Sequence, residues 1–338
     1  MKKSLIALAV LGAAAGAAQA QSAVTLYGIA DLWVGRASTT DFAGDKTSAT
    51  LMESGGVSGS RWGLTGSEDL GGGLKAVFRL ENGFSADTGT AKNASFGRQA
   101  YLGLAGGFGT VTFGNTWTAM DDILGASNSG FDSALSASQT VLAVPVAYAS
   151  NPGNTIKYVS PSFGGISAGF SHSLKEASGN GNITDFSVSY AAGPVAANFA
   201  YQVQNNVADF GGEDVKLTAL NGSYDLGVAK LLASYGQGKV DALKITDFQV
   251  GADVPLSSAM TLSVGYAQSK DNDALSGGKR TGFSVVGAYS LSKRTTVYGG
   301  FRTSKAKDGT VLATLDSEGN LTGDTKQRVF AVGLKHTF

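Results

Sequence analysis

Residues 328–338 read RVFAVGLKHTF, and the alternation within this stretch decides the fold class. Taken in steps of two, one face carries mostly large apolar side chains and the other carries small or charged ones. The first face holds Phe330, Val332, Leu334, His336 and Phe338, and the second holds Val329, Ala331, Gly333, Lys335 and Thr337. A period of two with one apolar face is the signal of a β-strand. The stretch is therefore expected to be a strand, and it ends on an aromatic residue.

The same alternation returns along the whole chain. We expect sixteen strands of about ten residues each, with the first over 22–37, the second over 57–68 and the last over 327–338. The connections between them alternate between short, glycine-rich turns, as at 69–73, and long polar segments, as at 38–57. In an up-and-down barrel this order places the short turns at one rim and the long loops at the other.

The composition agrees with a β-rich chain. The 338 residues include 48 glycines, 5 prolines and no cysteine, which is typical of many turns and excludes a disulfide framework. The 26 basic residues balance the 26 acidic ones, so the chain lacks the basic excess of a general nucleic-acid binder. Beyond the first twenty residues no apolar stretch is long enough to predict a transmembrane helix.

The first twenty residues read MKKSLIALAVLGAAAGAAQA. Two lysines, a short apolar run and a closing Ala-Gln-Ala are typical of a secretory signal peptide, and a membrane anchor would need a longer apolar run. We therefore expect a signal peptide at 1–20, cleaved before Gln21, and a barrel over 21–338. The protein is expected to be exported.

Two architectures have strands in which apolar and polar residues alternate in this way. A periplasmic β-sandwich or lectin brings its apolar faces together in a core and usually has fewer strands per domain. Here the polar face is rich in Gly, Ser, Thr and charged residues, and the apolar face often ends in an aromatic residue such as Tyr190, Tyr266 or Phe338. Sixteen strands enclose a lumen that side chains cannot fill, which favours a polar interior and an apolar exterior. We therefore predict an all-β fold, a 16-stranded antiparallel transmembrane β-barrel.

Such a barrel must be closed. An open sheet edge in lipid leaves backbone groups without partners, so the final strand is expected to pair with the first. This pairing places Phe338 in the periplasmic aromatic girdle.

Several stretches also resemble a known family, the trimeric general diffusion porins of Gram-negative outer membranes, of the neisserial and β-proteobacterial type. The matching stretches are VTLYGIAD (24–31), SRWGLTGSEDLGGGLKAVFRLENGF (60–84), RQAYLGLAGGFGTVTFGN (98–115), YVSPSFGGIS (158–167), LSKRTTVY (291–298) and VGLKHTF (332–338). They extend over the chain from 24 to its last residue. The chain departs from the family at Asn115, where an arginine is common.

The resemblance implies a cell outer-membrane homotrimer, surrounded by outer-membrane lipids, through which small hydrophilic solutes and ions diffuse passively. It also implies that Phe338 is an assembly signal, read by the outer-membrane assembly machinery. No cofactor and no nucleic-acid partner are expected.

One connection breaks the alternating pattern. Residues 117–152 are too long for a turn and only weakly strand-like, and connections of this length are usually functional or disordered. By resemblance this is the family's third loop, which folds into the lumen and sets the narrowest point. Its carboxylates are Asp121, Asp122 and Asp132. The alternative is an exposed surface loop.

Basic residues are expected on the facing wall. By alternation Arg61, Lys75, Arg79 and Lys157 point into the lumen, as does Lys230. Cations on one wall and carboxylates on the other produce a transverse field at the constriction, where charged side chains tune ion selectivity. The alternative is that these charges are simply solvated in a wide lumen. Arg98 shares the outward parity of Ala100, so it is assigned to the rim or a subunit contact.

The named cations outnumber the loop carboxylates, which favours a weak preference for anions. Asn115 and the inward Asp31 and Glu81 act in the opposite direction.

The chain offers little for catalysis. Its two histidines, His172 and His336, have no spacing that suggests a metal site or a catalytic triad. We therefore expect a channel and not an enzyme. The alternative function is an outer-membrane barrel that acts as an adhesin or surface-interaction protein, which would usually have larger outer loops.

Overall fold

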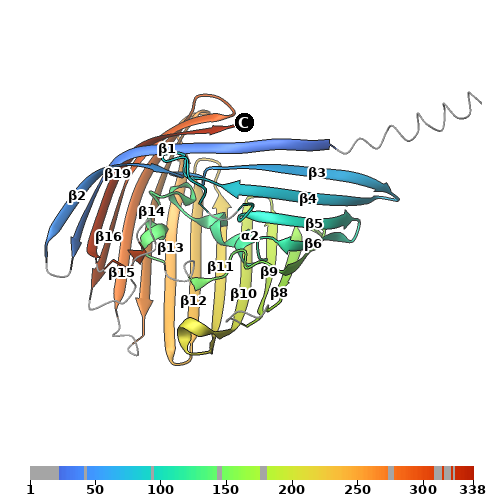
Figure 1. Ribbon diagram of the computed structural model, residues 1–338. Coiled ribbons are helices and arrows are strands. Elements are labelled where there is room, and N and C mark those ends of the chain that lie inside the picture. The colour runs from blue at the N-terminus through green and yellow to red at the C-terminus, as the bar shows by residue number, and fades with distance from the viewer. Residues whose placement is uncertain are drawn as a thin grey trace, which may run out of the picture.

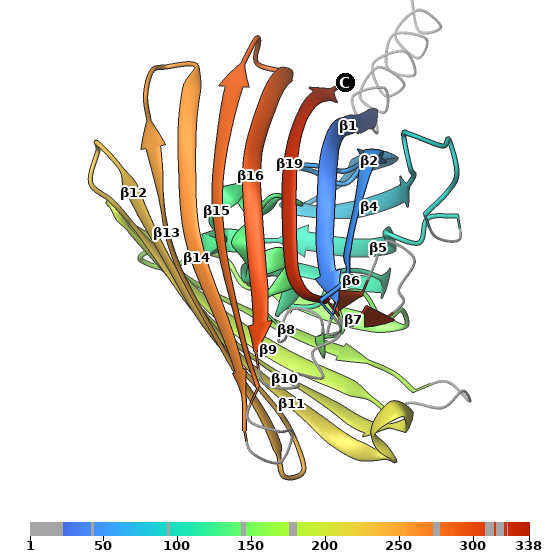
Figure 2. The ribbon, with the colours of Figure 1, turned by 90° about the vertical axis from the view of Figure 1, so that its left-hand side faces the viewer.

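The computed structural model describes residues 23–41, 44–92, 95–142, 147–175, 181–272, 278–307, 314–315, 321–322 and 324–338. The expected signal peptide, 1–20, lies outside them. Seventeen of the described strands form one closed antiparallel sheet, in which most strands lie beside the next one in the chain (Figure 1). Figure 2 shows the same barrel from the side, with β12 to β16, β19 and β1 following one another around the wall.

The strands of the first half are β1 (Ala23–Asp41), β2 (Lys46–Ser54), β3 (Arg61–Gly71), β4 (Leu74–Gly83), β5 (Gln99–Gly106), β6 (Gly109–Asn115), β7 (Thr155–Val159), β8 (Ile166–Ser173) and β9 (Ile183–Ala192). Those of the second half are β10 (Val195–Val207), β11 (Glu213–Asp225), β12 (Lys230–Val240), β13 (Leu243–Pro255), β14 (Met260–Asp271), β15 (Lys279–Ser290), β16 (Thr295–Lys307) and β19 (Asp324–Thr337). Two short strands, β17 (Thr314–Leu315) and β18 (Leu321–Thr322), pair only with each other.

The strand predicted from the last eleven residues closes the barrel. β19 pairs with β16 on one side and with β1 on the other. Beyond the end of β19, the N–H of Phe338 donates to the carbonyl of Gly28 at 3.0 Å, and the N–H of Gly28 donates to the carbonyl of Phe338 at 3.1 Å. The expectation that the last strand pairs with the first is confirmed.

β2 and β3 share one position in the wall. β2 pairs with the second half of β1, and β3 pairs with the first half. The barrel therefore has sixteen wall positions, as predicted, although the sheet has seventeen strands by name. The expected boundaries are wrong here, since the predicted loop 38–57 contains the end of β1 and all of β2. Polar residues on both faces of KTSATLMES hide its alternation.

Asp31 stabilises the backbone that connects β2 to β3, where the wall is interrupted. Its carboxylate is fully buried and accepts the backbone N–H groups of Gly56 at 3.0 Å, Val57 at 2.9 Å and Ser58 at 2.8 Å. The hydroxyl of Tyr298 donates to the same carboxylate. These bonds satisfy backbone donors that leave the sheet, which buried donors require.

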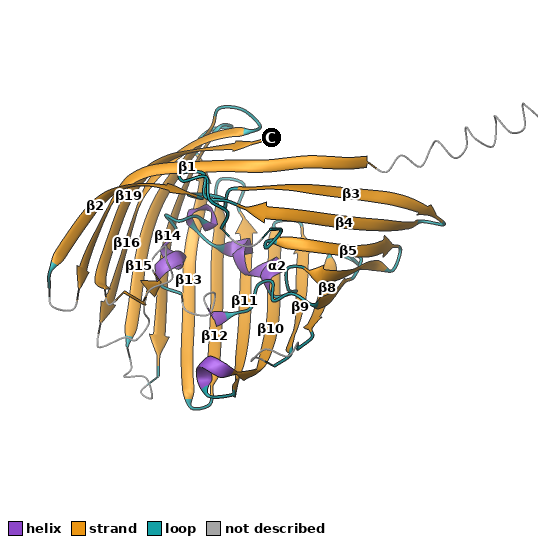
Figure 3. Cartoon of the chain, in the orientation of Figure 1, coloured by secondary structure: helices purple, strands orange, loops and turns teal. Residues whose placement is uncertain are grey.

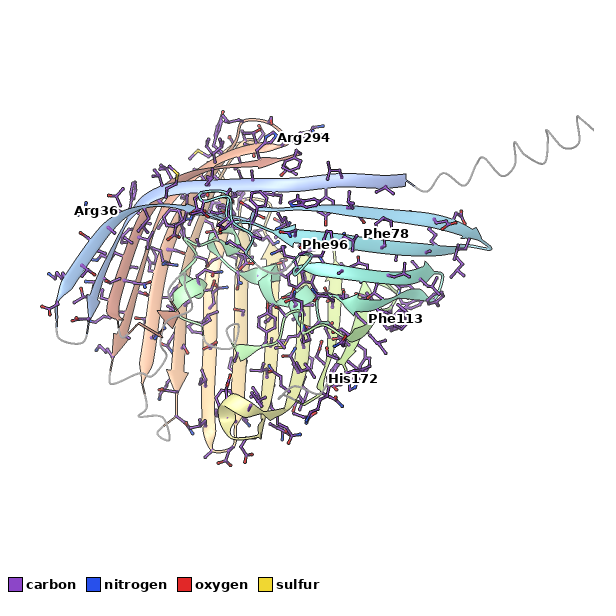
Figure 4. All side chains as sticks on the ribbon, in the orientation of Figure 1. Arg36, Phe78, Phe96, Phe113, His172 and Arg294 are labelled. Carbon is purple, nitrogen blue, oxygen red and sulfur yellow. The ribbon has the colours of Figure 1, made fainter. Side chains whose placement is uncertain are left out.

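The two faces of the wall have opposite character. On β19, Phe330 is 60% exposed and Val332 is 51% exposed, whereas Val329 is 6% exposed and Ala331 is fully buried. The same contrast holds around the barrel, and Figure 4 shows Phe113 on the outer side. The outward apolar face and the inward small or polar face are as the alternation predicts.

The two ends of the barrel also differ. At the end of the barrel where Phe338 lies, the turn between β3 and β4 consists of Gly71, Gly72 and Gly73. All three have positive φ, a conformation that glycine adopts without strain. We call this the short-turn end. The opposite end, where β1 stops at Asp41 and β19 starts at Asp324, carries the long connections and is called the long-loop end.

The helices of the described residues are short. None of them is long and apolar enough to cross a membrane.

Candidate functional site in the barrel lumen

The connection between β6 and β7 lies against the inner face of the wall (Figure 3). It contains α2 (Asp121–Leu124) and the short 3-10 turns η1 (Gly125–Ser127), η2 (Gly130–Asp132) and η3 (Ala137–Thr140). We call residues 116–142 and 147–154 the inner loop.

Side chains from eight wall strands hydrogen-bond to the inner loop. Ser171 on β8 accepts from Ala119 N, Gln202 on β10 accepts from Ala149 N, and six further strands also contribute. The bonds run from Met120 N to Asp185 Oδ1 (2.8 Å), Asn221 Nδ2 to Ile123 O (2.7 Å), Gln249 Nε2 to Ser127 O (2.9 Å), Gly130 N to Ser263 Oγ (2.7 Å), Ala137 N to Ser284 Oγ (3.1 Å) and Arg302 Nη1 to Ala134 O (2.6 Å). The strands are β9, β11, β13, β14, β15 and β16 in order, so the inner loop follows the wall over almost half its circumference. Four of these six wall partners are uncharged amide or hydroxyl side chains. None of the four was identified from the sequence.

Glycines in the wall make room for this contact. A Cβ atom at Gly265 would lie 1.7 Å from Ser129 Oγ, and one at Gly251 would lie 2.4 Å from Ser129 Cβ. A Cβ atom at Gly282 would lie 2.6 Å from a methyl carbon of Val141. The inner loop therefore packs where adjacent strands have no side chain, which is a common use of glycine at a close approach.

Three arginines lie close together on β3, on β4 and directly before β5, outside the strands that anchor the inner loop, and two of them contact one carboxylate. Glu81 is 3% exposed, and its Oε1 lies 2.7 Å from Arg98 Nε while its Oε2 lies 3.6 Å from Arg61 Nε. The hydroxyl of Tyr27 donates to Glu81 at 2.8 Å, and the guanidinium of Arg79 lies 5.8 Å from the centre of the Tyr27 ring. We call Arg61, Arg79 and Arg98 the arginine cluster.

The position of Arg98 differs from the expectation. Its side chain turns to Glu81 and also lies over the ring of Trp117, with 5.1 Å between the guanidinium carbon and the ring centre. Amide groups of the neighbouring wall and loop hold its backbone, since Asn151 Nδ2 donates to the Arg98 carbonyl at 3.0 Å and Asn115 Nδ2 donates to the Gly97 carbonyl at 3.2 Å. The assignment of Arg98 to the rim or a subunit contact is therefore wrong.

The reason is local. Arg98 precedes the first residue of β5, and Phe96 has a positive φ of 56°, so the period of two does not extend back to position 98. Parity predicts direction only inside a strand. The sequence signal that could have placed Arg98 in the site was the family motif RQAYLGLAGGFGTVTFGN, which begins at this residue.

The loop carboxylates form a second group. Asp122 Oδ2 lies 2.5 Å from Lys157 Nζ on β7, and the hydroxyl of Tyr148 donates to Asp121 Oδ1 at 2.5 Å. Burial raises the pKa of Asp121 to about 6, against the lowering effects of the Tyr148 hydrogen bond and of the charges on Lys157 and Arg98. We call Asp121 and Asp122 the acidic pair.

Arg98 connects the two groups, because its charge acts on Asp121 while its side chain binds Glu81. The remaining predicted residues lie elsewhere. Asp132 accepts a hydrogen bond from Asn128 within the inner loop at 2.7 Å, and burial raises its pKa. Lys75 is exposed near the start of β4, at the short-turn end, where it lies opposite Asp69 in the register of β3 and β4. It therefore belongs to neither group.

No group of three or more potential metal-ligating side chains occurs among the residues that the structure describes. His172 and His336 instead share hydrogen bonds with Thr184 at 2.8 Å and Thr295 at 2.9 Å.

A closed antiparallel barrel of sixteen wall positions, apolar outside, polar inside and narrowed by a loop that carries charged side chains, is the architecture of an outer-membrane channel. Residues 7–309 match the family model of the Gram-negative porins. The chain belongs to this family.

Individual relatives agree. The chain is 35% identical to outer membrane porin protein 32 of Delftia acidovorans and 30% identical to the major outer membrane protein P.IB of Neisseria lactamica, with full coverage of both chains in each case. It is also similar to the solved structure of an anion-selective porin from Comamonas acidovorans, with 30% identity and a TM-score of 0.81 over 94% of this chain and 100% of the other. The protein is an outer-membrane porin, a channel for passive diffusion of small hydrophilic solutes.

Proposed function

We propose that this porin favours anions over cations, and that the arginine cluster and the acidic pair set this preference at its constriction. The observation that carries the proposal is the imbalance of charge between the two groups. Arg61 and Arg98 place two positive charges against the single carboxylate of Glu81 and Arg79 adds a third beside Tyr27, whereas Lys157 offsets one charge of the acidic pair.

The exposure of these groups supports a role in conduction. The side chains of Arg61 and Arg98 remain 24% and 25% exposed and that of Asp122 remains 36% exposed, so all three meet the water of the lumen. Fixed charges in a narrow aqueous passage repel ions of like sign and attract ions of opposite sign. The structural similarity to an anion-selective porin supports the same sign.

The test is the reversal potential of refolded protein in a planar bilayer across a potassium chloride gradient. Arg61→Gln with Arg79→Gln removes two positive charges and keeps the short contact between Glu81 and Arg98. Two charges 4 Å apart in water interact with about 1 kcal/mol, so the ratio of chloride to potassium permeability is expected to fall about fivefold near 0.1 M salt. The effect is expected to shrink near 1 M, where the screening length is about 3 Å.

Lys293→Gln with Arg294→Gln is the matched control, because it removes the same charge from the turn between β15 and β16 at the barrel end. An equal reversal potential for both double variants would contradict the proposal.

The family resemblance supports a homotrimer, which we also propose. The short strands β5 and β6 carry large outward apolar side chains, with Leu102 63% exposed and Phe113 51% exposed, and small Ala100 beside them. Gly28 does not provide another small outward position for such a contact, since the ring of Phe338 covers it. Native mass spectrometry in several detergents tests this, and a monomer in all of them would contradict it.

A further inference from the structure

The apolar and polar faces of β11, β12 and β13 exchange sides near the long-loop end. Around the middle of these strands, Leu220 and Tyr235 face outward, whereas Asn221 and Gln249 face the lumen. Near the long-loop end the outward positions are exposed lysines and the inward positions are apolar, namely Val215, Leu217, Val240, Leu243 and Ile245. The interior of a water-filled barrel is usually polar, so this inward apolar surface needs a separate explanation.

The inner loop covers part of this surface. Val215 is 2% exposed and Leu217 is fully buried, and both pack in one apolar cluster with Met120 and Ile123 of the inner loop. The inward apolar residues of β12 and β13 nearest the long-loop end are only half-buried. Packing of the inner loop therefore accounts for one side of the surface and leaves the other side facing the lumen.

A cavity of about 230 Å³ lies over the uncovered side. The register of these strands, which lie side by side in Figure 1, arranges most of the lining in two rows across the sheet. One row is Leu217, Gly238, Ile245 and Asp271, and the other is Val215, Val240 and Leu243. Gly238 has no side chain, which leaves space between its two neighbours in the first row. Ala147 of the inner loop and Phe210 of η4 (Ala208–Phe210) also line the cavity.

Asp271 supplies an acidic group at one edge of this apolar cavity. Its side chain lies opposite Ile245 and is 2% exposed. The charges of Arg280 and Lys270 and nearby backbone groups act on it. Among the residues that the structure describes, neither carboxylate oxygen has a hydrogen-bond partner of ordinary geometry. A buried acceptor without a partner is costly, and a hydrogen bond to a charged group is stronger than one between neutral groups.

We propose that this cavity binds a small neutral aromatic solute that carries a hydroxyl group, that is, a phenol. An apolar cavity of about 150 Å³ accepts a benzene ring, so the larger cavity here admits two fused rings. Gly238 and Asp271 are two strand spacings apart, roughly 10 Å, so a ring system over Gly238 places its hydroxyl group at the carboxylate. An apolar lining with one polar group that fixes orientation is typical of a small-molecule site.

The surrounding charges favour a neutral solute. The carboxylate of Asp271 repels an aromatic anion, and Arg280 and Lys270 already offset its charge, so a cation gains little. The long-loop end is the outer one, since barrels of this class have short periplasmic turns. A phenol that enters from outside is therefore held beside the inner loop before it reaches the constriction.

The experiment titrates the refolded mature chain in detergent with a fluorinated 2-naphthol and follows binding by fluorine NMR, with detergent alone as the blank. One saturable site per chain is expected. Gly238→Leu fills the cavity and is expected to weaken binding at least about tenfold, since the ring loses its place. Gly287→Leu is the matched control on the outer face, where a Cβ atom meets only the carbonyl of Gly299, at 3.9 Å, and it is expected to bind as wild type does. Circular dichroism verifies that each variant is folded.

The hydrogen bond is tested separately with the methyl ether of the same probe, which has the ring system and no donor. The ether is expected to bind wild type about tenfold more weakly than the naphthol does. Asp271→Asn is expected to weaken naphthol binding about fivefold and to leave ether binding unchanged, a difference that a merely structural role of Asp271 would not produce. Equal naphthol binding by both leucine variants, or equal binding of the two probes to wild type, would overturn the proposal.

Discussion

The ring of Phe338 lies over Gly28 at the seam of the barrel, where a Cβ atom on Gly28 would fall 2.2 Å from the nearest ring carbon. The same two residues exchange both of their backbone hydrogen bonds. The last residue of the chain and a glycine near the start of β1 therefore close the sheet together, with the ring covering the seam on its outer face.

Phe338→Ala is expected to reduce the amount of folded porin in the outer membrane several-fold, because it uncovers the seam, and we propose that it also removes the assembly signal. Phe163→Ala is the control, since this aromatic is 70% exposed in a turn at the same end. The amount of folded porin in membrane fractions is measured by gel electrophoresis, from the band whose mobility differs between unheated and heated samples. An equal loss for both variants would mean that position 338 has no special role.

Glu81→Gln is expected to raise the preference for anions, the opposite of the change expected when arginines are removed. The substitution deletes the negative charge that Arg61 and Arg98 contact and keeps a hydrogen-bonding side chain of similar size. The change in interaction is about 1 kcal/mol per charge at 4 Å in water. The reversal potential at low salt measures it, and an unchanged reversal potential would show that Glu81 does not act on the conducted ions.

The preference is also expected to depend on pH. The Asp121 carboxyl, with its pKa raised by burial to about 6, is charged above that pH and neutral below it. As the pH falls from about 8 to about 5 the acidic pair loses one negative charge, so the preference for anions is expected to rise.

Asp121→Asn is the comparison for this titration, since it keeps a partner for the Tyr148 hydroxyl and cannot ionise. A reversal potential that still changes near pH 6 in this variant would assign the titration to another group.

Gly265→Val is expected to displace the inner loop, because a Cβ atom there would lie 1.7 Å from Ser129 Oγ. Single-channel conductance is expected to increase as the loop leaves the wall. Gly287→Val, on the outer face of β15, is the control and leaves the conductance unchanged. Equal conductance in wild type and Gly265→Val would show that the loop adapts without opening the passage.

The mature chain is expected to begin at Gln21 after removal of 1–20. Intact mass spectrometry of protein extracted from outer-membrane fractions checks this directly. A mass that includes the first twenty residues would contradict the proposed cleavage.

The alternation of residues was sufficient to predict the wall. It gave the direction of Phe330 and Val329 correctly, because lipid and lumen impose opposite demands on successive residues of every strand. It failed at β2, where lysine, serine and threonine face outward near the long-loop end and remove the contrast.

The candidate site was less predictable. Arg61 and Arg79 were placed inward by parity, but Arg98 was not, since it stands outside a strand. Neither Tyr148 nor Asp185 was identified as a site residue, because their roles depend on where residues distant in the chain meet the inner loop.

The inner loop is held largely by serine, asparagine and glutamine side chains on β11 to β15, seated on wall glycines. Hydrogen bonds of this kind are not screened by dissolved ions, whereas the field of the arginine cluster is. The sieving of solutes by size is therefore expected to stay constant between dilute and saline surroundings, while discrimination by charge fades as salinity rises. The same passage thus acts as a charge filter in fresh water and as a plain molecular sieve in brine.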